Sequence, residues 1–186
     1  MSLDGVLESI VAGIAAGVPA LKVCETIGGN VDLAEVQRRS RQLPAAFVFC
    51  IGTEDATLAQ DKVKTTGLFA TVLVVKSEPS APPVTMTRDA VVARLAGRII
   101  YAVTTAGDWG DGEVIGPPSA VDSRNRYSTA ADKAGAAIWA VSWRQKLELA
   151  ADPAPDELDD LEKILATWEL QDGTTPATDA TDEITP

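Results

Sequence analysis

The chain has 186 residues, of which 46% are hydrophobic and 23% are charged, with 16 basic residues, 27 acidic residues and no histidine. This is the composition of a globular protein, and the length suits one domain with a substantial core. Without histidine, Ser-His-Asp and Cys-His nucleophile pairs are excluded, and two cysteines are too few for a Cys₄ zinc or iron–sulfur site. The apolar runs carry charges or are too short to span a bilayer, and the first four residues lack the basic region of a signal peptide. We therefore expect no membrane segment, no bound metal and no cofactor.

The net charge of −11 is concentrated at the C-terminus. Residues 1–151 hold 16 acids and 15 bases, net −1, whereas residues 152–186 hold 11 acids and one base, net −10. A near-neutral body argues against sequence-specific DNA binding, which needs a clustered positive face. The acidic end has two interpretations: a solubilising tail, or a segment that docks on a basic partner surface or repels DNA.

The first 42 residues predict two helices separated by a strand. Apolar residues three and four positions apart over 3–18 predict an amphipathic helix, which Gly17 and Pro19 end. Residues 20–27 alternate in the manner of a strand, and residues 30–42 predict a shorter helix with three arginines near its end.

Two apolar strands are predicted next. Residues 45–51 are continuously apolar, which is typical of a central strand, and residues 68–76 are rich in β-branched and aromatic side chains. Residues 52–66 between them lack periodicity and predict a long loop or a protruding hairpin. Three prolines in residues 77–85 predict a linker.

A long helix capped by Thr87 is predicted to run to about Val103. Glycines over 106–112 predict a turn, and a short strand is expected around residues 114–115. The polar residues 119–134 predict an exposed loop.

The clearest strand spans residues 135–149, where apolar and polar side chains alternate, so one face should be buried and the other wet. Residues 156–170 show helical spacing of apolar residues, and the residues after 170 have almost nothing to bury. The sequence thus predicts an α+β domain over residues 1–151, an acidic helix within 152–170 and a disordered tail over 171–186. The domain should hold a single mixed, mainly antiparallel sheet with helices packed on one face.

Few residues suggest chemistry. Cys24 and Cys50 are expected to be buried free thiols, although a disulfide is conceivable if their strands are neighbours, and neither has an imidazole base. The acids around the glycine-rich turn do not match a calcium loop, so a polar turn is the better interpretation. Trp109 in that turn either folds back onto the core or anchors a partner.

The ordered elements together resemble the small tail-completion proteins of Mu-like long-tailed phages and prophages and, more widely, tail terminators. The resemblance covers about residues 1–150 and rests on element order, size and patterns, for instance Arg88-Asp89-Ala90-Val91-Val92-Ala93-Arg94-Leu95 and Ala140-Val141-Ser142-Trp143. The acidic segment after Asp152 departs from this pattern as an extension.

The resemblance implies a non-enzymatic virion protein that forms a homo-oligomeric ring, usually hexameric, at the head-proximal end of the tail tube. Such a ring ends tube polymerisation and joins the tail to the neck, because a heterologous interface closes when the rotation fits. The implied partners are copies of itself, the tail tube protein and a neck or connector protein. Genomic DNA would pass through the lumen without specific binding, and assembly would take place in the host cytoplasm.

The loops at 52–66 and 104–134 are candidates for the contact faces, because interaction sites commonly lie on loops held by a rigid sheet. The candidate interface residues are Lys62, Lys64, Trp109, Arg124, Arg126 and Trp168. Two alternatives stay open: a head-completion or neck connector ring, and an unrelated soluble enzyme or small-molecule binder that relies on carboxylates.

Overall fold

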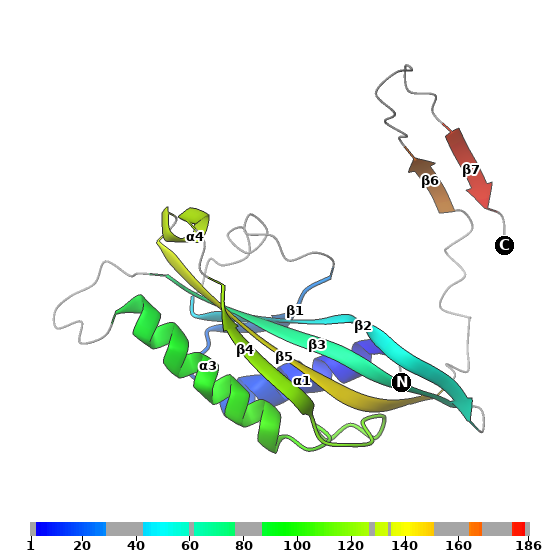
Figure 1. The fold of residues 1–186 in the computed structure, drawn as a ribbon, viewed down its shortest axis with the longest axis horizontal. Helices are drawn as coiled ribbons and strands as arrows, with labels where there is room; N and C mark the ends of the chain where they lie inside the picture. The colour runs from blue at the N-terminus through cyan, green and yellow to red at the C-terminus, as the bar shows by residue number, and fades with distance from the viewer. Residues whose placement is uncertain are drawn as a thin grey trace. The chain divides into compact units, whose positions relative to one another are not determined.

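Figure 1 shows the fold in a computed structural model of the chain. The structure describes residues 3–28, 43–59, 62–76, 87–126, 129–133, 135–150, 164–168 and 180–184. The chain divides into two compact units, Met1–Ala151 and Asp152–Pro186. The helix predicted over 30–42 and the linker predicted over 77–85 lie outside the described residues. No helix of the described residues is long and apolar enough to cross a membrane.

The first unit is built on a five-stranded sheet in the order β1-β2-β3-β5-β4 (Figure 1). Its strands are β1 (Val23–Thr26), β2 (Ala45–Ala59), β3 (Lys62–Lys76), β4 (Ser119–Asn125) and β5 (Ala136–Ala150). Strand β1 pairs with β2 in parallel, and the other three pairings are antiparallel. The prediction of a mixed, mainly antiparallel sheet is confirmed.

Helices α1 (Leu3–Gly17) and α3 (Arg88–Thr105) cover one face of this sheet. Val6, Ile10 and Ile14 of α1 are buried at the predicted helical spacing, and the buried residues of α3 join the same core cluster. The hydroxyl of Thr87 accepts a hydrogen bond from the backbone N–H of Ala90 at 3.3 Å, which satisfies one free donor of the first turn of α3. Both helix predictions are confirmed. A short helix, α4 (Thr129–Lys133), precedes β5.

The register of β3 and β5 sorts side chains between the two faces of the sheet. Phe69 lies opposite Trp143, and both are buried under the helices with their ring centroids 5.8 Å apart. Leu147 is also buried on this inner face, whereas Arg144 and Lys146 are exposed on the other, the outer face. The alternation predicted for β5 is therefore confirmed.

Of the two interpretations of residues 52–66, the structure shows the protruding hairpin, because β2 continues to Ala59 and β3 begins at Lys62. The loop predicted over 119–134 is wrong, because it contains β4 and α4. Strand β4 lies at the edge of the sheet and is mostly exposed, so its residues are polar and lack an apolar period. The strand predicted at 114–115 is reduced to one bridge, between Val114 and Leu147.

The second unit contains an antiparallel pair of strands, β6 (Ile164–Trp168) and β7 (Ala180–Ile184). The acidic helix predicted within 152–170 is therefore wrong at 164–168, and the disordered tail predicted over 171–186 is wrong at 180–184. The β-branched Ile164 and Thr167 and the aromatic Trp168 suit a strand. Helical spacing in a short apolar stretch does not exclude pairing with a partner strand that lies further along the chain.

Candidate protein interface

Neither thiol is set up for chemistry. Cys24 and Cys50 are free, and although their strands are neighbours, the register places Cys24 opposite Ala46, four residues from Cys50. Burial raises the pKa of Cys24 to about 11, and burial also raises the pKa of Cys50. Within the described ranges, no three His, Cys, Asp or Glu side chains are grouped closely enough to hold a metal ion. Large apolar side chains are exposed on the surface of the first unit, on the hairpin of β2 and β3 and on α3.

The hairpin tip, defined as residues 54–59 and 62–64, is the first such surface. Strand β5 pairs with β3 out to the contact between Lys62 and Ala150, so the tip is supported on one side by a third strand. This pairing makes the backbone of the tip part of the sheet.

The predicted residues Lys62 and Lys64 lie together at this tip. Their ammonium groups are 2.8 Å and 3.5 Å from the carboxylate of Glu148, and their side chains are 50% and 51% exposed. The hydrogen bond from Lys62 lowers the pKa of Glu148, and the same bond raises the pKa of Lys62. Exposed pairs of this kind add little stability but fix the positions of charges on the surface.

Apolar side chains are exposed on the same hairpin. Leu58 is 77% exposed at the tip, and Ile51, lower in β2, is 60% exposed. The register places Leu58 opposite Val63, so it points away from the face that holds Lys64. Single exposed apolar side chains are common on protein surfaces, and a contact that covered Leu58 would remove its apolar area from water.

The outer face gathers the positive charge of the sheet. Every Lys and Arg of β3, β4 and β5 falls on this face by register, namely Lys62, Lys64, Lys76, Arg124, Arg144 and Lys146. The cause is physical, because the inner face is buried under the helices and a buried unpaired charge is costly. Several of these charges are paired, as in the contacts of Arg144 with Glu54 and of Arg124 with Asp122.

The predicted interface residues Arg124 and Arg126 do not join the hairpin tip. Arg124 lies opposite Ala140 on the edge strand, ten positions along β5 from Ala150, which corresponds to roughly 33 Å. Arg126 follows it, exposed, with its backbone N–H donating to the carbonyl of Ile138 at 3.0 Å. Trp168 belongs to the second unit, where β6 contains it. Among the predicted interface residues of the first unit, only Lys62 and Lys64 form one site.

Trp109 folds back onto the core. Its indole N–H donates to the side-chain oxygen of Gln145 at 2.8 Å, and its ring lies 6.1 Å from that of Trp143. Gln145 is buried and donates in turn to the carbonyls of Gly107 (2.8 Å) and Gly116 (3.0 Å), so it fixes the whole turn. Of the two alternatives for Trp109, the structure shows the core one. Its replacement would consequently disturb the fold as well as any contact.

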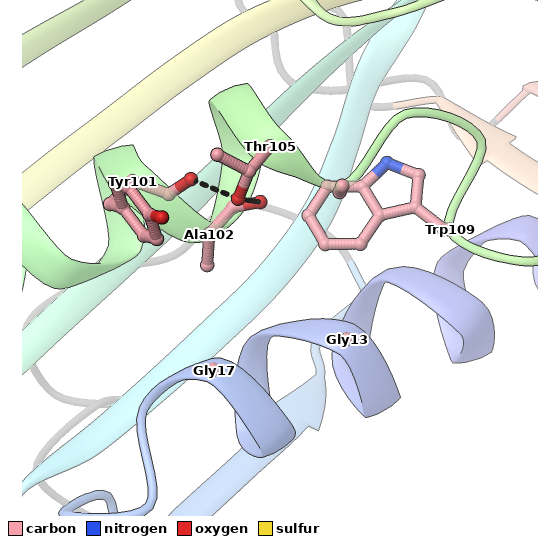
Figure 2. A pocket seen from close by; sticks show the side chains of 7 residues that line it. Gly13, Gly17, Tyr101, Ala102, Thr105 and Trp109 are labelled. Carbon is pink, nitrogen blue, oxygen red and sulfur yellow. Dashed lines mark hydrogen bonds between the residues drawn. The ribbon is translucent and has the colours of Figure 1, made fainter.

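A groove lies beside this ring, between α1 and α3 (Figure 2). It has a volume of about 340 Å³ and is lined by Gly13, Gly17, Tyr101, Ala102, Thr105 and Trp109. A Cβ built on Gly17 would lie 2.9 Å from that of Ala102, so glycine is what lets the helices approach closely. Tyr101 is 71% exposed, and the hydroxyl of Thr105 donates to its backbone carbonyl at 2.7 Å. Sequence patterns alone did not predict this groove.

A signal for the groove exists in the sequence, but it is weak. Gly13 and Gly17 are one helical turn apart in an apolar helix, which is typical of close packing against another element. The sequence does not say that the other element is the C-terminal end of α3.

Comparison with known protein families finds no match, and no curated protein is significantly similar in sequence.

Proposed function

We propose that this chain is a structural protein of a long-tailed phage particle. In this proposal, copies of it form a ring, with six subunits as the expected number, at the head-proximal end of the tail tube. The ring ends tube polymerisation and joins the tail to the neck, acting by shape without making or breaking covalent bonds. Its partners are the tail tube protein and a neck or connector protein, and genomic DNA passes through its lumen.

One observation supports this proposal above the others: the first unit exposes apolar side chains on two unlike surfaces. Leu58 projects from the hairpin tip, and Tyr101 borders the groove between α1 and α3. Unlike surfaces suit a heterologous contact, in which each copy meets its neighbour through a different patch. Such contacts repeat around an axis and close into a ring when the rotation fits. The sheet, which holds the hairpin rigidly, suits a subunit that works through its shape.

Growth of the tail tube tests the proposal. The full chain is added to tubes growing from the tube protein of the phage or prophage that carries it. We expect the chain to bind at one end of each tube and to stop elongation, as seen by electron microscopy with a gold-labelled tag. A variant with Lys133→Ala, in α4 and away from both surfaces, is the matched control and should behave as the unmodified chain does. Tubes that elongate unchanged in saturating protein, with no label at their ends, would overturn the proposal.

A further inference from the structure

We draw no further inference here: the strongest candidate, the groove between α1 and α3 beside Trp109, carries nothing because nothing in the structure shows what covers it.

Discussion

Replacing Gly13 with alanine should disturb the packing of Trp109, whereas the same replacement at Gly97 should stabilise the protein. Both glycines lie inside helices, Gly13 in α1 and Gly97 on the exposed side of α3. A Cβ built on Gly13 would lie 2.4 Å from Cε3 and 2.8 Å from Cζ3 of Trp109, whereas a Cβ on Gly97 would meet no atom within 4 Å. The two sites therefore differ in the space around the new methyl group.

The magnitudes follow from two opposing effects. Alanine stabilises a helix interior relative to glycine by about 0.5–1 kcal/mol, and both variants gain this. At Gly13, overpacking opposes the gain by about 1–3 kcal/mol, because carbon atoms pack best at about 3.5–4.0 Å. The ring of Trp109 cannot shift freely, since its N–H is bonded to Gln145. We expect the free energies of unfolding of the two variants to differ by about 1–3 kcal/mol, since the helix propensity is common to both.

Urea unfolding, followed by circular dichroism and tryptophan fluorescence, gives this difference. The slope against urea should be equal in both variants, so that the shift in midpoint reports stability. Gly13→Ala in a Trp109→Leu background should be tolerated as well as Gly97→Ala is, because the clashing ring is gone. Equal stabilisation by Gly13→Ala and Gly97→Ala in the unmodified background would refute the placement of Trp109 over α1.

Three further predictions concern the core. Gln145→Leu should lower the free energy of unfolding by about 1–3 kcal/mol, because the Trp109 N–H and two backbone carbonyls lose their hydrogen-bond partner. The near-ultraviolet circular dichroism should also decrease, and an unchanged spectrum would contradict this prediction. Thr71→Val should raise the unfolding midpoint, by up to about 1 kcal/mol of stability, because the buried Thr71 hydroxyl has no hydrogen-bond partner; a lower midpoint would show that the hydroxyl is satisfied. Cys24, whose pKa is raised from 9.0 to about 11, should be alkylated by iodoacetamide at pH 8 about a hundredfold more slowly than in the unfolded chain, as mass spectrometry can follow. The Cys24 thiol keeps its proton to a higher pH in the folded chain than in the unfolded chain. The free energy of unfolding should therefore fall as pH rises from 9 towards 11.

The strands that hold the core are visible in the sequence because burial repeats at the period of a strand. In β5, apolar Val141, Trp143 and Leu147 alternate with polar side chains, since one face meets the helices and the other meets water. Lys62 and Lys64 were candidates from the sequence, but only the pairing of β3 with β5 places them on one face of the sheet. Helices α1 and α3 were predictable because each has one apolar stripe.

The hairpin extension, the edge strand β4 and the pair β6–β7 were not predictable from local pattern. Their exposed positions have no reason to be apolar, so what makes them strands is backbone pairing with a segment far along the chain. A short polar or mixed segment adopts the strand state only when a neighbouring edge is available. Periodicity within the segment does not contain that information.

The amino-acid sequence by itself determined the class of fold, the main core strands, the absence of imidazole chemistry and the concentration of acid at the C-terminus. Only the tertiary structure decided that Trp109 lies over Gly13, that Gln145 fixes the turn, and that α1 and α3 leave a groove between them. The reason is distance along the chain: Gly13 and Trp109 lie on different elements, and packing of the whole sheet brings them together. Composition and period describe each element alone, whereas a groove exists only between two.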